Sequence, residues 1–342
     1  MTKRATMNDI AQVAGVSQAT VSLVLNEVPN ARVSAATRAR VKALAEGLGY
    51  GRGGLAGRAL AGRALDTRVI GMLIDDVTGT PFAAPLIDGA RLAAAAQGCV
   101  VATFCTGSDP AMEQAALQVL AATGLVGVLY ATLVTRMVQP PAGLAGLPVV
   151  LLNCHDKARQ FASVTPGDVT AGFAATEVLI GAGHRRIAHL AGEDWGEAAR
   201  DRALGYRRAL TSHDVRFDPA LLVGPAWTVA SGRERTLQLL DLAQPPTAIF
   251  CFNDRVAIGC YEALAARGLR VPEDMSVMGF DNDDLVANLQ PPLSTMVLPH
   301  DEMARWAVAQ LLERGDKPLA ARRAKIDCEP CLRGSVGVPR PG

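Results

Sequence analysis

The sequence predicts an α/β protein that has a small three-helix N-terminal domain, a linker, and a larger core of two lobes built on parallel β-sheets. Two observations lead to this fold class. The first 50 residues contain three short segments with helical apolar spacing, and from residue 69 short apolar runs alternate with longer amphipathic stretches. We therefore predict a helical domain at 1–50, a linker at 51–68, a core at 69–335 and a tail at 336–342.

The first predicted helix begins after Thr6. The spacing of Thr6 and Asp9 is typical of a capping box, in which the Thr6 hydroxyl accepts a hydrogen bond from the Asp9 amide. Apolar side chains then recur at helical spacing at Ile10, Val13 and Ala14. Gly15 supplies the backbone freedom that a sharp turn out of the helix requires.

Two further helices complete this domain. Ser17 is a candidate cap for a helix at 18–26, whose inward side chains are Val21, Val24 and Leu25. A third helix from Ser34 would close a small core with three apolar side chains, namely Val41, Leu44 and Leu48. The exposed side of the second helix then carries short, neutral, polar side chains that can approach phosphates and base edges closely.

The charge of the chain is unevenly distributed, although its formal net value is only +1. Residues 1–68 hold ten Lys and Arg against four Asp and Glu, whereas the remainder holds 24 against 29. A basic N-terminal domain on a mildly acidic body indicates a small module that faces a polyanion.

Helical periodicity alone also fits an ordinary helical hairpin. The identities of the residues at individual positions are needed to distinguish a DNA-binding domain from such a hairpin. Residues 7–26, MNDIAQVAGVSQATVSLVLN, closely resemble the helix-turn-helix head of the lac-repressor (LacI/GalR) family of bacterial regulators. Residues 33–41 and 48–50 resemble the same family. The resemblance implies that this domain binds double-stranded operator DNA.

The resemblance also implies roles for individual residues of the head. It assigns base reading to Gln18, Ala19 and Leu23. Leu23 departs from the Arg of many relatives and can contact a thymine methyl group but cannot form the bidentate pair with guanine. Phosphate contacts are assigned to hydroxyl and amide side chains, namely Thr6, Ser17, Thr20, Ser22, Asn26, Ser34 and Thr37.

The linker at 51–68 is rich in Gly, Ala and Arg, with five glycines among eighteen residues. Each glycine costs a helix about 1 kcal/mol relative to alanine, so we expect no stable helix here in isolation. A flexible linker is the simpler interpretation. In the resembled family this position holds a hinge helix that orders on the operator, which implies minor-groove insertion by Leu60 and a DNA contact by Arg58.

The body alternates strand-like and helix-like segments, which implies parallel sheets covered on both faces. The predicted strands are VIGMLI (69–74), VVATFC (100–105), GVLYA (127–131), PVVLL (148–152), IAHLAG (187–192), AIFCF (248–252) and SVMGF (276–280). The predicted helices are 85–97, 112–122, 170–181, 198–210, 233–242, 254–267 and 300–313. Ligands of such sheets bind beyond the carboxyl ends of the strands.

This order of segments resembles the periplasmic-binding-protein-like core of the same family. The resemblance implies an effector pocket between the lobes in which Arg202, Asn253 and Asp281 hydrogen-bond a sugar or sugar acid. Further contacts are assigned to Trp227, Phe82 and Asn153. Other interpretations of three of these residues stay open: Asn253 could cap the following helix, Trp227 could belong to the core, and Arg202 could pair with Asp201 or Glu197.

Composition excludes several other classes of protein. No apolar run approaches the roughly 18 residues of a membrane span, and no apolar segment follows the basic N-terminus as in a secretory signal, so we expect a cytoplasmic protein. The seven cysteines are scattered and favour buried, reduced thiols. Cys328 and Cys331 form an isolated CxxC, so no metal is expected. No cofactor is expected either, because the weak glycine pattern at 51–56 follows no strand.

The predicted function is that of a homodimeric transcriptional regulator, acting as a repressor under allosteric control by a small effector. The alternatives are a solute-binding protein or an enzyme on the same two-lobed core. Against an enzyme, the sequence has no GxSxG, HExxH or Walker A pattern. The tail after 335 lacks a leucine heptad, so no tetramer through the tail is expected.

Overall fold

The chain divides into two compact units, Met1–Asp66 and Thr67–Gly342. In both, a computed structural model describes residues 6–25, 33–48, 68–78, 82–313 and 319–340. Within these ranges no helix is long and apolar enough to cross a membrane.

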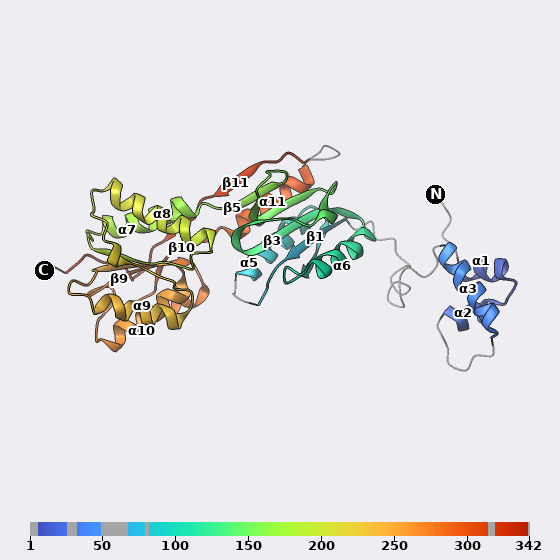
Figure 1. The fold of residues 1–342 in the computed structure, drawn as a ribbon, viewed down its shortest axis with the longest axis horizontal. Coiled ribbons are helices and arrows are strands. Elements are labelled where there is room, and N and C mark those ends of the chain that lie inside the picture. Colours follow the sequence, from blue (N-terminus) through green and yellow to red (C-terminus); the bar gives the residue numbers. More distant parts are fainter. Residues whose placement is uncertain (1–5, 26–32, 49–67, 79–81, 314–318, 341–342) are drawn as a thin grey trace. The chain divides into compact units, whose positions relative to one another are not determined.

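The described part of the first unit is a three-helix domain (Figure 1). It consists of α1 (Met7–Ala14), α2 (Gln18–Leu25) and α3 (Ala35–Gly47). The helices share a core whose fully buried side chains are Ile10, Val21, Val24 and Val41. The predicted helices are therefore confirmed.

The helix ends follow the capping chemistry expected from the sequence. The Thr6 hydroxyl accepts from the Asp9 amide at 3.2 Å, and the Asp9 carboxylate accepts from the Thr6 amide at 2.7 Å, so the capping box is confirmed. Gly15 ends α1 with φ at +64°, a left-handed conformation that favours glycine. Ser17 caps α2 by accepting from the Thr20 amide at 3.1 Å.

Two apolar residues of this domain lie outside its core, contrary to the prediction. Val13 is 63% exposed, and Leu48 is 43% exposed. An eight-residue helix that packs on two neighbours buries only a narrow stripe, here Ile10, Ala11 and Ala14. Leu48 follows the last residue of α3, so it lies beyond the helix face that carries Val41.

The second unit contains two α/β lobes. The sheet of the first lobe has the order β11-β5-β4-β3-β1-β2, with all neighbours parallel. Its strands are β1 (Arg68–Ile74), β2 (Cys99–Cys105), β3 (Leu125–Val138), β4 (Val149–Asp156), β5 (Ala162–Pro166) and β11 (Arg323–Ile326). Helices α5 (Ala83–Ala95) and α11 (His300–Glu313) cover one face, and α6 (Pro110–Ala121) with the short η1 (Ala142–Leu144) covers the other.

The sheet of the second lobe has the order β12-β10-β9-β8-β6-β7 and is parallel except for the β10–β12 pair. Its strands are β6 (Ile187–Leu190), β7 (Leu222–Val223), β8 (Ala248–Cys251), β9 (Ser276–Asp281), β10 (Ser294–Val297) and β12 (Pro330–Cys331). One face is covered by α7 (Asp168–Gly181) and α8 (Glu197–Ser212), the other by α9 (Val229–Leu240) and α10 (Asp254–Ala266). The short helices η2 (Pro219–Leu221) and η3 (Asp284–Asn288) lie in connections.

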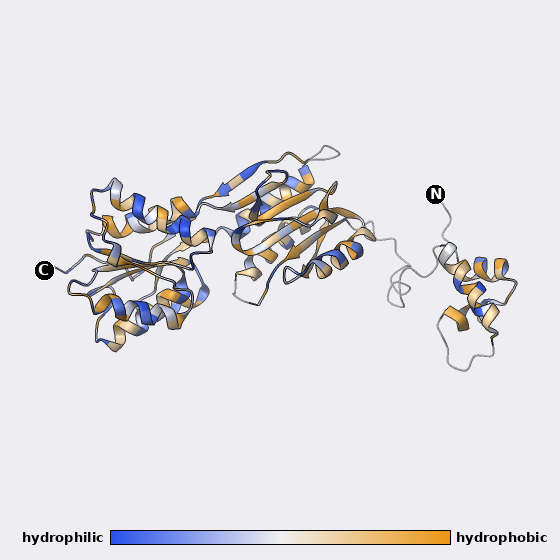
Figure 2. Ribbon diagram, viewed as in Figure 1, coloured by the Kyte–Doolittle hydropathy of each residue, from blue (hydrophilic) through white to orange (hydrophobic). Residues whose placement is uncertain are grey.

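The chain crosses between the lobes three times, namely from β5 to α7, from β10 to α11 and from β11 to β12. Figure 2 shows that the strands of the first lobe are largely hydrophobic, whereas the helices of the second lobe alternate polar and apolar residues. The seven predicted strands and seven predicted helices are all present; most ends differ by a few residues, and β3 extends to Val138 instead of ending at 131.

The cysteines follow the expectation with exceptions. All seven are unpaired, and Cys105 is exposed rather than buried because it ends β2, an edge strand of its sheet. Cys331 is partly exposed on the short edge strand β12.

Candidate ligand pocket and nucleic-acid interface

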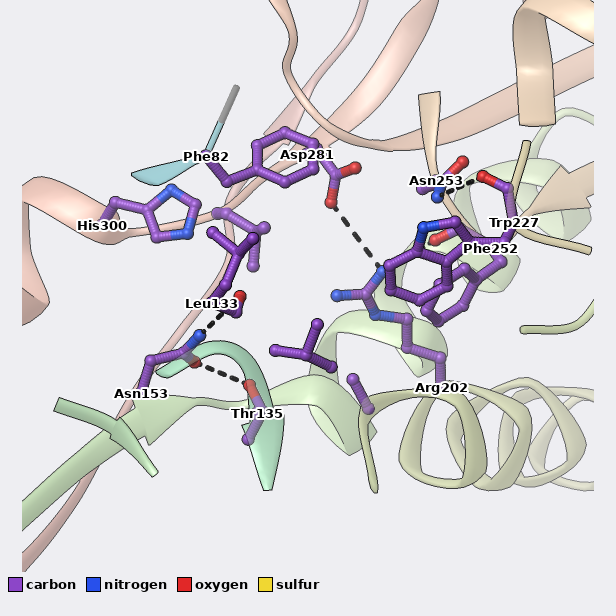
Figure 3. Close-up of a pocket in the computed structure, with 13 residues that line it drawn as sticks. Phe82, Leu133, Thr135, Asn153, Arg202, Trp227, Phe252, Asn253, Asp281 and His300 are labelled. Atoms are coloured by element: carbon purple, nitrogen blue, oxygen red, sulfur yellow. Dashed lines mark hydrogen bonds and ion pairs between the residues drawn. The ribbon is translucent and has the colours of Figure 1, made fainter. Parts of the chain in front are cut away.

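A pocket that is partly open to solvent lies between the two lobes of the second unit. The six residues predicted to bind an effector all line it (Figure 3). They come from both lobes: Phe82 and Asn153 from the first, and Arg202, Trp227, Asn253 and Asp281 from the second. Because these positions lie at or near the carboxyl ends of strands, or at the start of the helices that follow, parallel-sheet topology brings them together.

Arg202 is the central cation of this pocket, and it is held in place from several sides. Its Nε donates to Asp168 at 2.8 Å, and Nη1 donates to the Phe252 carbonyl at 2.7 Å. The guanidinium lies over the Phe280 ring at 3.4 Å and over the Phe252 ring at 4.7 Å from their centroids. Its nearest ion-pair partner is thus Asp168 from α7, not the Asp201 or Glu197 considered from the sequence.

Asp281 lies beside Arg202 at the end of β9, with its Oδ1 3.9 Å from Nη1. The carboxyl group is buried, and its Oδ2 has no hydrogen-bond partner among the described residues. Burial raises the pKa of Asp281 well above its ordinary value; Arg202 opposes this shift, and Asp254 and Asp168 add to it. An oxygen atom in this state can form a hydrogen bond with a ligand.

The two asparagines of the pocket use their amides mainly to hold the backbone. Asn253 caps α10 by accepting from the Val256 amide at 2.8 Å, and its Nδ2 donates to the Trp227 carbonyl at 3.2 Å. Asn153 donates to the carbonyls of Thr132 and Leu133 and accepts from the Thr135 hydroxyl at 2.7 Å. Asn253 therefore both lines the pocket and caps the helix, and Asn153 fixes the pocket-lining segment of β3.

Aromatic rings form two walls of the pocket (Figure 3). Trp227 stacks at an angle on Phe252, with centroids 5.2 Å apart, and Phe82 stacks on His300 at 6.0 Å. Trp227 is therefore a pocket residue and only partly buried. Burial lowers the pKa of His300 to about 4, with Arg202 contributing, so this imidazole is neutral at pH 7.

Seven of the residues that line this pocket were not predicted from the sequence. They are Leu133, Val134, Thr135, Ala198, Phe252, Leu298 and His300. Phe252 could have been found, since it directly follows β8 and precedes Asn253. No local sequence pattern marks His300 as a pocket residue. It begins α11, directly after the chain crosses from β10 of the second lobe, and only this crossing places it at the pocket.

The predicted DNA-contacting residues of the head that the structure describes are exposed or partly exposed on the three-helix unit. Gln18, Ala19 and Leu23 are exposed on α2, and Thr20 and Ser22 are partly exposed.

All the predicted hydroxyl residues of the head except Ser22, which lies in the middle of α2, are at helix N-termini. Ser17 bonds to Thr20, and Ser34 accepts from the Thr37 amide at 3.1 Å. Thr6 is exposed while it caps α1. Helix N-termini and their hydroxyl groups are suited to phosphate. The predicted contacts of Asn26, Arg58 and Leu60 lie outside the described residues.

Comparison with family models gives two matches along the chain. Residues 6–52 match "Bacterial regulatory proteins, lacI family", and residues 176–336 match "Periplasmic binding protein-like domain".

Curated relatives extend over nearly the whole chain. The ribose operon repressor of Haemophilus influenzae is 33% identical over 97% of this chain and 98% of its own length. The transcriptional repressor CytR of Escherichia coli is 33% identical over 97% of this chain and 96% of its own length.

Solved structures give the same result for the fold. The lac repressor dimer bound to operator and the anti-inducer ONPF matches with a TM-score of 0.65 and 25% identity, over 98% of this chain and 100% of that one. The regulator CelR in complex with cellobiose matches with a TM-score of 0.63 and 27% identity, over 97% and 100%.

Proposed function

This chain belongs to the LacI family of bacterial regulatory proteins, and we propose that it is a homodimeric repressor whose α2 faces read a two-fold operator while the pocket binds a small polyol. The observation that carries the DNA-binding role is the exposed polar face of α2 on a capped three-helix unit. We assign base contacts to Gln18, Ala19 and Leu23. We also propose that the protein acts in the cytoplasm, where the bacterial DNA lies.

Dimerisation follows from the weakness of one such head. A few neutral side chains on one short helix give little affinity, and joining two heads raises the effective concentration of the second at a two-fold site. A dimer of the lac repressor was solved on its operator, which supports the same arrangement here.

Duplex selection with the full-length protein tests the DNA-binding role. A random duplex pool should yield a two-fold sequence, and affinity for it should fall steeply with salt, by about 10³-fold or more between 50 and 200 mM if six or more phosphates are contacted. Gln18→Ala should weaken binding to the selected sequence more than to unrelated DNA. Gln12→Ala, an exposed change on α1, is the matched control. If the protein selects no DNA sequence, the operator-binding proposal fails, and a solute receptor or an enzyme becomes the better interpretation.

The chemistry of the pocket favours a ligand rich in hydroxyl groups. Arg202 is a donor, and the unpaired oxygen of Asp281 is an acceptor; the two groups lie side by side, so adjacent hydroxyls can bond to both. Trp227 and Phe82 offer apolar surface for the C–H face of a ring. Since Asp168 already pairs with Arg202 at 2.8 Å, a neutral sugar fits better than a sugar acid.

We propose that this ligand controls DNA binding by closing the lobes. Coupling of about 1–3 kcal/mol, or 5-fold to 150-fold in affinity, is sufficient for such a switch and must act in both directions. A thermal-shift screen over sugars, sugar acids and nucleosides identifies the ligand, and operator affinity is then measured with and without it. An unchanged operator affinity would remove the allosteric part of the proposal.

A further inference from the structure

Trp195 is a large aromatic side chain that remains 61% exposed beside the pocket. It belongs to the connection between β6 and α8, at the carboxyl end of β6. Its ring lies 6.4 Å from that of Trp227, which in turn lies 5.2 Å from Phe252. Trp227 and Phe252 line the pocket, whereas Trp195 does not. The three rings therefore form a row that leads from the pocket out to solvent.

The connection that carries Trp195 is fixed by several contacts. The Gly196 amide donates to the Glu193 carbonyl at 2.9 Å, and Arg200 Nη1 donates to the Asp194 carbonyl at 2.7 Å. Gly192 packs so closely on Phe252 that a Cβ there would lie 2.9 Å from the ring. The loop that carries the indole is thus fixed by backbone hydrogen bonds and by the packing of Gly192 on Phe252, a ring that lines the pocket.

We infer that Trp195 is an outer stacking subsite, and that the effector has a second ring attached to the polyol ring bound by Arg202 and Asp281. This inference rests on the proposed effector role of the pocket. A ligand that reaches Trp195 must extend beyond the pocket, because Trp195 lies outside its lining. A second sugar ring and a nucleoside base share the property required, a flat face that stacks on an indole.

An isolated exposed tryptophan would carry little weight, since single exposed apolar side chains are normal. The continuity of the row distinguishes Trp195. Exposed Leu285 and Leu332 line no aromatic wall of this pocket, although their exposed fractions are similar, at 66% and 60%.

Matched ligand pairs test the inference on the full-length protein. The one-ring probes are glucose, galactose and ribose, and the two-ring probes are cellobiose, lactose, adenosine and cytidine, with affinities taken from thermal shift and titration calorimetry. A two-ring probe should bind at least 10-fold tighter than its one-ring counterpart. Comparing disaccharides with nucleosides identifies the source of the second ring.

Three variants separate stacking from general effects. Trp195→Ala should weaken the two-ring ligand about 10-fold and change the one-ring ligand less than 2-fold, whereas Trp195→Phe should retain most of the affinity. Leu285→Ala is the control for loss of an exposed apolar side chain and should change neither.

The outcomes also separate this inference from the proposed function. If one-ring compounds bind and change operator affinity but a second ring adds nothing, or Trp195→Ala weakens both classes equally, the subsite is refuted while the effector pocket stands. If no two-ring compound binds, the subsite is likewise refuted. If ligands bind but none changes operator affinity, the regulatory role fails instead, and the Trp195 comparison still decides the subsite.

Discussion

Asp281 has a conformation and an environment that are unfavourable for the protein alone. Its φ is +116°, a region that L-residues rarely adopt, and its buried Oδ2 lacks a partner among the described residues. A buried polar atom without a hydrogen bond costs about 1–3 kcal/mol. Residues that reduce stability in this way concentrate at binding sites, where the ligand supplies what the fold leaves out.

Asp281→Asn should therefore separate stability from binding. Because burial raises the pKa of Asp281, the ionised carboxylate opposes folding at pH 7. The free energy of unfolding of the variant should therefore equal that of wild type or exceed it by up to about 1 kcal/mol. The stabilisation by the ligand, about 2.7 kcal/mol for wild type at 100 times its dissociation constant, should be lost. Exposed Asp284→Asn should alter neither quantity. Full ligand stabilisation in Asp281→Asn would show that Asp281 does not touch the ligand.

His189 gives the core a dependence on acid. It is buried on β6 between Phe250 and Tyr206, and burial lowers its pKa to about 4. The folded state then binds fewer protons than the unfolded state between pH 4 and pH 6.5. The contribution of neutral His189 to the free energy of unfolding is therefore fully present above pH 6.5 and is lost as the pH falls toward 4. The slope is at most about 1.4 kcal/mol per pH unit for this one proton.

His189→Phe should remove this part of the slope in urea unfolding measured from pH 7 to pH 4. Tyr206→Phe is the control: it deletes the hydrogen bond to the Ile187 carbonyl but no group that titrates in this range, so its curve should be offset without a change of slope. His300 still contributes acid sensitivity in every variant. An identical slope in His189→Phe and wild type would contradict the assignment.

At the residue scale the sequence predicts pocket members better than their partners. Arg202, Asp281 and Trp227 could be placed because short motifs follow strands whose ends meet. The Arg202–Asp168 pair could not, since it depends on the packing of α7 against α8. The hydrogen bonds of Asn153 likewise depend on the bulge of β3 between Ala131 and Arg136.

Close contact between α7 and α8 positions Arg202 at the element scale. A Cβ on Gly172 would overlap the backbone carbonyl of Arg202, and one on Gly205 would overlap that of Val169. The two helices therefore approach with backbone against backbone, which only glycine allows. This approach holds the Arg202 side chain next to Asp168 at the start of α7.

Gly172→Ala should push α8 away at the position of Arg202. We expect a loss of about 1–3 kcal/mol in unfolding free energy, as for other overpacked sites, together with weaker ligand binding. Gly181→Ala on the same helix is the matched control: nothing lies within 4 Å of its Cβ, so stability should stay the same or rise by up to about 1 kcal/mol. Wild-type ligand affinity in Gly172→Ala would show that the helix contact does not position Arg202.

The elements that the sequence did not predict share a physical reason. The missed strands are β5, β7, β10, β11 and β12. Strands β7 and β12 have two residues each, and β11 is a polar edge strand, so none has a clear apolar run. Strands β5 and β10 lead into crossings between the lobes, where a regular alternation of strand and helix gives no signal.

At the scale of the whole second unit, α8 connects the pocket to the lobe arrangement. Ala198 and Arg202 of α8, one turn apart, line the pocket. Glu197 and Asp201, also one turn apart, pair with the first lobe: Glu197 with His155 of β4 at 2.8 Å, and Asp201 with Lys325 of β11 at 3.8 Å. Neighbouring faces of α8 thus line the pocket and form ion pairs with the first lobe.

Glu197→Gln should weaken this connection without touching the pocket. A charge-assisted hydrogen bond of a partly buried pair contributes about 1 kcal/mol, so ligand affinity should fall about 3-fold to 10-fold because closing the lobes becomes less favourable. Glu177→Gln is the matched control, since Glu177 pairs with His213 at 3.0 Å inside the second lobe and its loss should leave affinity unchanged. Calorimetry gives the affinities, and the distance between spin labels on the two lobes gives the closure. An unchanged distance and affinity in Glu197→Gln would mean that the Glu197–His155 pair does not contribute to holding the lobes together.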